Sequence, residues 1–250
     1  MCAQSSKNLI CIPLSITNVY LIPCQGGYLQ VDTGFHKDYP AYRKALHKLG
    51  VQLSDIKYLF LTHHHDDHAG FLNELASETQ LTIIANQFST ELLLTGKNDT
   101  THGLGWVSPM VETTITTMRR LDPQWEAGFP PFRLREQDIC IEGDNFEILR
   151  KIGIAGDILY TPGHCLDHQV LLLDVGELIC GDAASSAYLF AGTHYCTFLM
   201  SDMETAYQSW QKMLDAGAQT IHPAHGDPFS AARLQENMGK IKTRDLILQS

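Results

Sequence analysis

The stretch Thr62-His63-His64-His65-Asp66-Asp67-His68-Ala69-Gly70 places four histidines and two aspartates directly after the apolar run 56–61. Imidazole and carboxylate groups crowded at the end of a buried strand carry a desolvation and repulsion cost that a bound cation offsets. Neutral imidazole and carboxylate are the ligands that suit zinc and its first-row neighbours. The stretch therefore predicts a metal site at the end of a strand.

The spacing within this stretch separates two sets of side chains. Alternate residues of an extended segment point to the same side, so His63, His65 and Asp67 share one side, and His68 begins a turn in which it can face a second ion. By the same alternation His64 and Asp66 point away, and we expect a structural or solvent-facing role for both. We expect the same of five histidines elsewhere in the chain: His36, His47, His102, His168 and His222.

Later parts of the chain supply the ligands that a site with two metals still lacks. His164 lies in the turn TPGH after an apolar run, Asp182 ends the run LICGD, and His225 follows the run TIHPAH. Each is a potential ligand at the end of a strand-like segment.

This ordered pattern resembles the metallo-β-lactamase-fold superfamily of metallohydrolases, whose signature is H-x-H-x-D-H followed by a separate histidine, aspartate and histidine. The segment Val31-Asp32-Thr33-Gly34 matches a further landmark of that family. The resemblance implies an α/β fold, a four-layer αβ/βα sandwich with two facing sheets, outer helices and the metals in a cleft at one edge of the sheets.

The resemblance also implies a role for each ligand. Three residues would bind the first metal, three the second, and one would bridge them: His63, His65 and His164; Asp67, His68 and His225; and Asp182. The expected cofactor is a pair of divalent metal ions, zinc (Zn²⁺) in the first place and Mn²⁺ or Fe²⁺ as alternatives. Asp32 and Thr62 are expected to support the metal loop from behind through hydrogen bonds.

Such a centre has a defined chemistry. Two zinc ions sharing a water would lower its pKa from about 15.7 toward neutrality and hold a bridging hydroxide as the nucleophile. Asp67, as ligand and acceptor, would orient the hydroxide and shuttle its proton. Tyr188 and His194, on the loop after Asp182, are candidates for contact with a substrate oxyanion or leaving group.

Position 182 narrows the choice of branch within the family. An aspartate there is similar to the glyoxalase II, lactonase and phosphodiesterase branches, whereas zinc β-lactamases place cysteine or serine there. Glyoxalase II enzymes usually carry a helical domain after the last metal histidine, and only a short stretch follows His225. Acyl-homoserine lactonases usually show a tyrosine where this chain has Ser185.

We therefore expect a dinuclear metal-dependent hydrolase that cleaves a small ester, lactone or thioester. Three alternatives stay open: a mononuclear iron oxidoreductase similar to persulfide dioxygenases, a phosphodiesterase, and a noncatalytic metal-bound binding protein. Iron content and oxygen consumption would separate the first of these from a hydrolase.

Composition sets the wider limits. A chain of 250 residues with 44% apolar content can bury a sizeable core, and we expect one domain over residues 1–250. The 18 Lys and Arg against 28 Asp and Glu give a net charge of −10, which opposes nucleic-acid binding. Two divalent ions would outweigh the carboxylates of Asp67 and Asp182, so small anionic substrates stay possible.

Location and partners are expectations of the same kind. The seven cysteines are odd in number and contain no C-x-x-C pair, so they are expected to be reduced thiols. No run approaches the ~20 apolar residues of a membrane span, and no secretory signal is evident. We expect a cytoplasmic protein with a small-molecule substrate that has an apolar portion, and neither a membrane nor a nucleic-acid partner; the oligomeric state is not predicted.

Local patterns predict alternating strands and helices. The runs 9–14, 19–22 and 28–31 indicate an antiparallel meander, and 38–49, which holds Pro40 and precedes Gly50, indicates a helix on the outside of a sheet. Further strands are predicted at 56–61, 81–84, 146–149, 157–160, 169–173, 177–180 and 220–221. Further helices are predicted at 69–76, 205–216 and 231–247.

The segment 85–137 contains none of the expected ligands and is predicted to be a helical insertion. It is rich in apolar and aromatic residues, among them Trp106, Met118, Trp125 and Phe129. Two interpretations stay open: a lid or substrate wall over the metals, or a helical insertion packed on its own domain. We expect the apolar part of the substrate to contact this segment.

Overall fold

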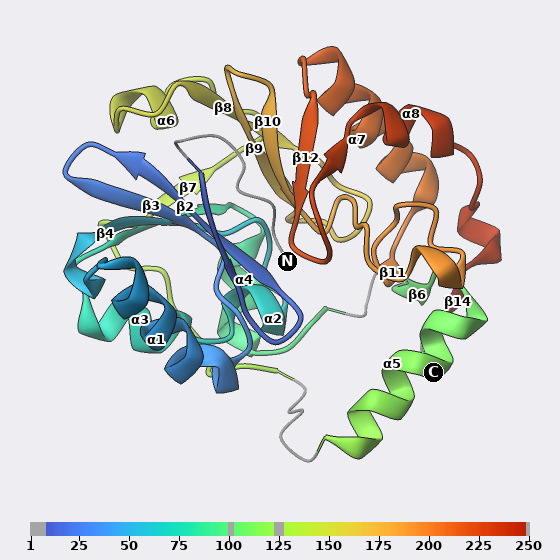
Figure 1. The fold of residues 1–250 in the computed structure, drawn as a ribbon, viewed down its shortest axis with the longest axis horizontal. Helices are drawn as coiled ribbons and strands as arrows, with labels where there is room; N and C mark the ends of the chain where they lie inside the picture. The colour runs from blue at the N-terminus through green and yellow to red at the C-terminus, as the bar shows by residue number, and fades with distance from the viewer. Residues whose placement is uncertain (1–8, 100–102, 123–127, 249–250) are drawn as a thin grey trace.

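Two β-sheets face each other at the centre of the fold (Figure 1). The structure is a computed structural model and describes residues 9–99, 103–122 and 128–248; His102 and Trp125 lie outside the described residues. A buried apolar layer fills the space between the sheets, with Phe60 and Ile84 from the first and Leu171 and Ile179 from the second.

The first sheet has the strand order β1-β2-β3-β4-β5-β7. Strands β1 to β3 are antiparallel, which confirms the predicted meander, and β3, β4, β5 and β7 are parallel. Its strands are β1 Ile10–Pro13, β2 Asn18–Cys24, β3 Gly27–Val31, β4 Ile56–Phe60, β5 Thr82–Asn86 and β7 Ile139–Ile141.

Helices of the first half cover the outer face of this sheet. They are α1 Tyr39–Leu49, α2 Asp66–Ala69, α3 Leu72–Glu78 and α4 Ser89–Thr95. Tyr42, Leu75 and Leu93 from α1, α3 and α4 pack in one buried cluster with residues of the sheet. The predicted outer helix at 38–49 is confirmed, and it ends at Gly50 with φ of 71°, a backbone that glycine adopts readily.

The second sheet has the strand order β13-β12-β10-β9-β8. Its strands are β8 Gly156–Tyr160, β9 Gln169–Leu173, β10 Glu177–Gly181, β12 Thr220–Pro223 and β13 Phe229–Ser230. The remaining helices are α5 Pro109–Leu121, in the insertion, and α6 Ile148–Lys151, α7 Met203–Asp215 and α8 Ala232–Asn237 in the second half. Short 3₁₀ turns lie at His36–Asp38, Leu53–Asp55, Leu189–Ala191 and Thr243–Asp245.

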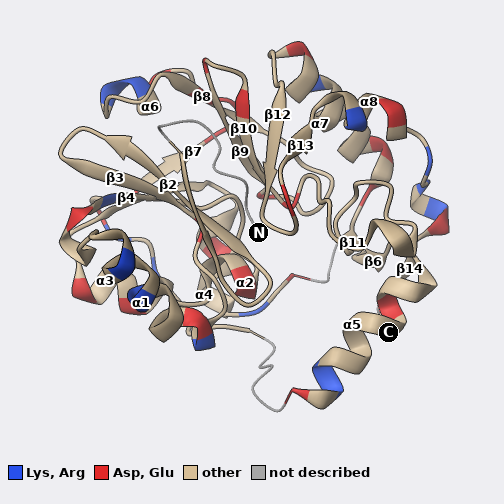
Figure 2. Cartoon of the chain, in the orientation of Figure 1, with Lys and Arg blue, Asp and Glu red and all other residues tan. Residues whose placement is uncertain are grey.

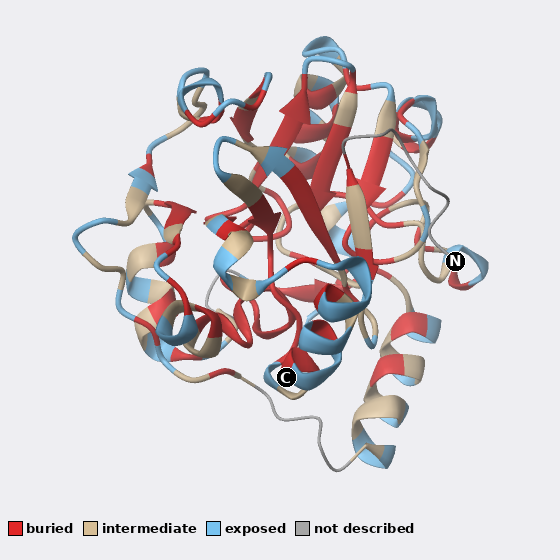
Figure 3. Cartoon of the chain, turned by 60° about the vertical axis from the view of Figure 1, so that its left-hand side comes forward, coloured by how far each residue is buried: buried red, intermediate tan, exposed pale blue. Residues whose placement is uncertain are grey.

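A second apolar cluster lies on the outer face of the second sheet. It joins Trp210 and Met213 of α7 to Val111 and Ile115 of α5 and to Leu234 of α8. Figure 3 shows buried strands at the centre and helices whose outer faces are exposed. The predicted four-layer αβ/βα sandwich is therefore confirmed, with helices outside two sheets that face each other.

The insertion is held by a third, small sheet. Strand β6 Gly105–Trp106 pairs with β11 Leu199–Met200 on one side and β14 Ile247–Leu248 on the other. Helix α5 follows, capped by the Ser108 side chain, which accepts a hydrogen bond from the Val111 amide at 3.2 Å. This segment thus crosses from the first half of the chain to the second (Figure 1).

Three predicted elements were wrong in type or extent. The segment 146–149 is not a strand: the Asn145 side chain accepts hydrogen bonds from the amides of Glu147 and Ile148, and helix α6 begins there. The helix expected at 231–247 is α-helical only over α8, with a short 3₁₀ turn at Thr243–Asp245. The helix expected at 69–76 is two helices, α2 and α3, that meet at Gly70.

Gly70 marks a close approach of two loops. A Cβ at this position would lie 2.4 Å from the carbonyl oxygens of both Asp66 and Gly34. Only glycine therefore allows α2 to pack against the segment that carries Asp32. Among the described residues, no helix has both the length and the apolar character that crossing a membrane requires.

Candidate metal centre

The histidines and aspartates predicted as ligands meet at one edge of the two sheets. His63 and His65 follow β4, His164 follows β8, and Asp182 and His225 come directly after β10 and β12. Asp67 and His68 lie in the short helix α2, and all seven residues are buried. The strand ends and α2 thus bring together residues that are as far apart in the chain as His63 and His225.

The first group consists of three imidazoles. The Nε2 atoms of His63 and His164 lie 3.2 Å apart, and the Nδ1 atom of His65 lies 2.9 Å from Nε2 of His164. Burial and the neighbouring imidazoles hold the pKa values of His63 and His65 well below the usual range, and burial also lowers the pKa of His164. These rings are therefore neutral and offer nitrogen lone pairs to a cation.

The second group mixes imidazole with carboxylate. The Nε2 atom of His225 lies 3.1 Å from an oxygen of Asp67 and 3.1 Å from an oxygen of Asp182. Burial lowers the pKa of His225, but the two carboxylates outweigh it and raise the pKa to about 10. Burial also lowers the pKa of His68, but the carboxylates of Asp67 and Asp32 outweigh it, and the pKa of His68 lies well above its usual range.

Asp182 lies between the two groups. One of its oxygens is 3.6 Å from Nε2 of His164, and the other is 3.6 Å from Nε2 of His68. Its carboxylate also accepts a hydrogen bond from the Thr197 hydroxyl at 3.0 Å, and its amide donates to Nε2 of His168 at 3.1 Å. This is the position that a residue shared by two cations requires.

Contacts behind the ligands orient the imidazoles. Nδ1 of His164 lies 2.7 Å from the Leu199 carbonyl oxygen, and Nδ1 of His225 lies 2.9 Å from that of Ile16. Because a carbonyl accepts only from an N–H, each Nδ1 carries the proton and leaves Nε2 facing the centre.

Asp32 supports the loop that carries the candidate ligands, residues 62–68, through hydrogen bonds. Its carboxylate accepts from the amide and the hydroxyl of Thr62, each at 2.7 Å, and lies 2.8 Å from Nδ1 of His68. Its backbone has φ of 59°, an uncommon conformation for a residue other than glycine. These contacts match the supporting arrangement expected of Asp32 and Thr62.

The donor set fits divalent cations. The Nε2 atom of His68 is buried and has no hydrogen-bond partner among the described residues, and carboxylate oxygens of Asp67 and Asp182 lie 3.6 Å from it. A buried polar atom without a partner costs free energy that a cation among these donors would recover. Cys165 lies beside the first group, but burial raises the pKa of its thiol well above the usual range, so it packs there as a neutral side chain.

Comparison with known proteins agrees with this geometry. The family model described as the metallo-beta-lactamase superfamily matches residues 12–225. The chain belongs to this superfamily. Its members are mostly metal-dependent hydrolases.

Curated relatives share the superfamily but differ in length. The chain is 28% identical over 227 residues to the Beta-lactamase-like protein 2 homolog of Drosophila melanogaster, covering 90% of this chain and 62% of that protein. It is 24% identical over 217 residues to the Probable metallo-hydrolase YqjP of Bacillus subtilis, covering 82% of this chain and 65% of that protein. The chain thus spans somewhat less than two thirds of the length of these two relatives.

Solved structures show the same fold. The archaeal metallo-beta-lactamase superfamily protein ST1585 from Sulfolobus tokodaii superposes with a TM-score of 0.62 at 18% identity, covering 94% of this chain and 86% of that one. BJP-1, a subclass B3 metallo-β-lactamase of Bradyrhizobium japonicum, gives a TM-score of 0.62 at 18% identity, covering 89% and 76%. At this identity the likeness shows the superfamily fold alone.

A small cavity opens over the centre and has two walls. The predicted ligands Asp67, Asp182 and His225 contribute to one wall, together with Asp66, the side chains of the opening loops and residues 198–199. The other wall comes from the insertion. Its members in the cavity lining are Asn98, Trp106, Ile115 and Arg119. Of the two interpretations of segment 85–137, the wall over the metal site is the one that this placement supports.

His64 and Asp66 attach the insertion to the metal loop. Nδ1 of His64 lies 2.9 Å from the buried carboxylate of Asp167, and its Nε2 accepts from the Asp99 amide at 3.0 Å. Asp66 accepts from the Asn98 side chain at 2.9 Å and from the Gly128 amide at 3.3 Å. These contacts agree with the structural role expected of His64 and Asp66, although Asp66 also lines the cavity, and the sequence contains no local signal for their partners.

Several other residues around the centre were not predicted. Thr17 and Thr197 donate hydrogen bonds to Asp67 and Asp182. His168, expected to be structural, is buried and accepts from the Asp182 amide. A threonine or histidine that supports a ligand carries no spacing signal, because its partner lies on another strand.

Tyr188 and His194 lie on the loop after Asp182 and are not among the described residues that line the cavity. The Tyr188 ring packs at 5.3 Å against that of Phe198, and its hydroxyl faces the sulfur of Met118 at 3.5 Å. Both residues have positive φ, 56° and 50°. A role for either in the reaction stays a prediction.

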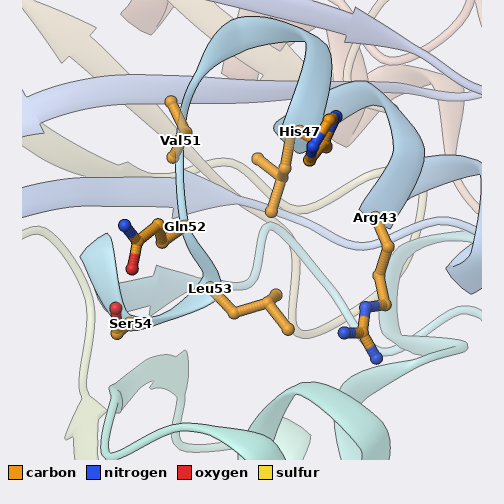
Figure 4. Close-up of a pocket in the computed structure, with 7 residues that line it drawn as sticks. Arg43, His47, Val51, Gln52, Leu53 and Ser54 are labelled. Atoms are coloured by element: carbon orange, nitrogen blue, oxygen red, sulfur yellow. The ribbon is translucent and has the colours of Figure 1, made fainter.

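A larger hollow of about 350 Å³ lies elsewhere, on the outer side of α1 (Figure 4). Arg43 and His47 of α1 and residues 51–54 line it. Arg43 already pairs with Glu78 at 3.0 Å, and no cluster of metal-binding side chains among the described residues includes a residue of this hollow. The chemistry of the chain therefore lies at the histidine and aspartate cluster.

Proposed function

We propose that this chain is a hydrolase that uses two divalent metal ions, zinc in the first place, to cleave a small ester, lactone or thioester. The observation that carries the proposal is the position of Asp182 between two groups of ligands, with oxygens 3.6 Å from both His164 and His68. Superfamily membership supports it, because most members are metal-dependent hydrolases.

The proposed ligands fall into the two groups that their contacts in the structure define. His63, His65 and His164 would hold one ion; Asp67, His68 and His225 would hold the other; Asp182 would be shared. Divalent ions at such a site supply a nucleophile at neutral pH by lowering the pKa of water, and they polarise the acyl oxygen of the substrate. The same centre could hold manganese or iron, since imidazole and carboxylate bind all three metals.

Asp67 and the apolar residues of the cavity contribute to the proposed reaction in different ways. Asp67 accepts a hydrogen bond from Thr17 at 3.1 Å and lies 3.1 Å from His225, so its carboxylate is fixed where it can orient the nucleophile and accept its proton. Trp106, Ile115 and Phe198 give the cavity an apolar wall, which suits a substrate with an apolar portion and excludes water from the reacting bond.

The first experiment measures metal content by elemental analysis of protein purified without added metal, together with turnover of lactone, thioester, phosphodiester and β-lactam substrates. About two zinc or manganese ions per chain with hydrolysis of an ester, lactone or thioester supports the proposal. About one iron per chain, oxygen consumption and no hydrolysis contradicts it and points to an oxidoreductase.

A variant pair tests the assignment of the site. Asp67→Ala should abolish turnover, whereas Asp215→Asn, which changes an aspartate at the end of α7 bonded to Gln211, should leave it unchanged. Undiminished turnover in Asp67→Ala would contradict the assignment.

A further inference from the structure

A buried carboxylate lies beside the first group of ligands without belonging to it. Asp167 is in the loop between β8 and β9, three residues after His164, and its side chain is fully buried. Its carboxylate lies 2.9 Å from Nδ1 of His64 and accepts a hydrogen bond from the Ser89 hydroxyl at 2.7 Å. A third hydrogen bond comes from the thiol of Cys165. Donors from three parts of the chain thus meet at this carboxylate.

Asp167 connects the two loops that carry the first group. His64 lies in the middle of residues 62–68, the loop with two imidazoles of this group, and Cys165 directly follows the third imidazole, His164. The sulfur of Cys165 lies within 4.8 Å of a ring nitrogen of each of the three imidazoles, and also within 4.8 Å of a ring nitrogen of His64 and a carboxylate oxygen of Asp167. The sulfur is thus close to both the first group and the buried carboxylate.

The hydrogen bonds of His64 indicate that this cluster supports the centre and is not a further cation site. The Asp99 amide donates to Nε2 of His64 at 3.0 Å, so Nε2 carries no proton. The ring proton is therefore on Nδ1, which donates to Asp167. Because both ring nitrogens have partners, His64 offers no lone pair to a metal ion.

The carboxylate of Asp167 also brings a negative charge to this side of the centre. Burial raises the pKa of Asp167, but His64 and the other hydrogen bonds outweigh burial and bring the pKa to about 2. No lysine or arginine is among the buried residues in the described part of the chain. Figure 2 shows such residues on outer helices, for example on α1, α6 and α8. A buried negative charge of this kind favours a cation nearby.

We propose that Asp167 is a positioning residue for the metal ion of the first group. Through its hydrogen bonds it holds the loop 62–68 against the loop that carries His164, so that the three imidazoles stay at the spacing that a cation requires. Its contact with Ser89 joins both loops to α4. This deepens the proposed function and rests on it, because it takes the first group to hold a metal ion.

Zinc affinity, measured separately for each group on the full chain, tests this proposal. His225→Ala leaves the first group intact and His63→Ala leaves the second, and competition with a chromogenic chelator gives the zinc affinity of each. Adding Asp167→Ala should weaken zinc binding about tenfold or more in His225→Ala, as is typical for loss of a partner behind a ligand. In His63→Ala the same change should alter the affinity by less than about threefold. Asp167→Asn keeps an acceptor for His64 and should give an intermediate affinity.

Asp138→Ala is the matched control, because it removes another buried carboxylate. The hydrogen bonds of Asp138 come from Arg135 and from the Ile83 amide, both outside the ligand loops. This variant should leave both zinc affinities unchanged even where the Tm falls. Unchanged zinc binding by the first group in Asp167→Ala overturns the proposal. Equal weakening of both groups also overturns it, since Asp167 would then only stabilise the fold.

If Asp167→Ala does not fold, a pair of variants at His64 decides the question in the same His225→Ala chain. His64→Ala removes the donor to Asp167 and should weaken zinc binding about tenfold, whereas His64→Asn, which can donate from a similar position, should stay within about threefold of the parent. Equal zinc affinity with alanine, asparagine and histidine at position 64 overturns the proposal.

These measurements do not depend on turnover. If wild type binds zinc but hydrolyses none of the substrates, the proposed function fails, and the zinc affinities still decide the role of Asp167. If wild type binds no zinc, both proposals are contradicted.

Discussion

The two groups of ligands in the centre differ in charge although they lie side by side. His63, His65 and His164 are neutral imidazoles whose pKa values are lowered by burial. His225 has a raised pKa because the carboxylates of Asp182 and Asp67 outweigh burial, and His68 has a raised pKa because those of Asp67 and Asp32 do. The imidazoles of the first group therefore offer lone pairs without losing a proton. Those of the second group hold protons beside the carboxylates, and a metal ion has to displace these protons.

The largest effect is expected where the two groups meet. Asp182→Asn removes the charge that both share and should lower kcat/KM by about 10³-fold or more, a loss of several kcal/mol of transition-state stabilisation. Metal content measured by elemental analysis should fall in the same variant. Asp157→Asn, a change in β8 at the surface, serves as the control. If both variants had similar kinetics, Asp182 would have no special role in the reaction.

The pH dependence of metal binding separates the two groups directly. With the pKa of His225 at about 10, the second ion must displace a proton at pH 7 to 9. Its affinity should rise at least about tenfold per pH unit, or at least about 100-fold over this range, because His68 as well as His225 holds a proton, while that of the first ion stays nearly constant. Calorimetric zinc titration in buffers of different ionisation enthalpy counts the protons released, and equal proton release for both ions would break the comparison.

A smaller effect on metal affinity is expected from a change at Asp32, which contacts His68 of the second group. Asp32→Asn removes the charge that faces Nδ1 of His68 and should weaken the second ion by about 10- to 100-fold. The first ion should change less, because the Nδ1 atoms behind it face the Leu199 carbonyl and the Thr62 hydroxyl instead. Competition with a chromogenic chelator measures both affinities; equal weakening of the two ions speaks against separate groups.

The smallest effect should come from a single neutral hydrogen bond. Thr197→Val removes the donor to the Asp182 carboxylate, a contact of about 1 kcal/mol, and should lower kcat/KM about fivefold. Thr193→Val, whose hydroxyl bonds the Ala187 carbonyl on the same loop, is the control. If both variants behave like wild type, Asp182 does not need this support.

The cluster of candidate metal ligands could be predicted because its signal is local. His63 and His65 follow one strand at a spacing that alternation explains, Asp67 and His68 belong to the same short motif although they lie in α2, and each remaining candidate follows an apolar run. The meander and the outer helix at 38–49 were predictable for the same reason, since apolar periodicity and glycine positions within a short window determine them.

The second wall of the cavity could not be predicted, because its contacts join distant parts of the chain. No local pattern shows that Asp66 binds Asn98 or that Ile115 lines the same cavity as Asp67. The strand expected at 146–149 failed because the Asn145 side chain caps a helical turn there, a local hydrogen bond that outweighs the alternating pattern.

Strand β14 bears on the order in which the protein is assembled during synthesis. Ile247–Leu248 pairs with Gly105–Trp106, so the wall that carries Trp106 is completed only after residue 248 has left the ribosome. All the ligand loops lie between residues 63 and 225 and emerge earlier. The candidate ligands are therefore synthesised before the strand that completes the small sheet around Trp106.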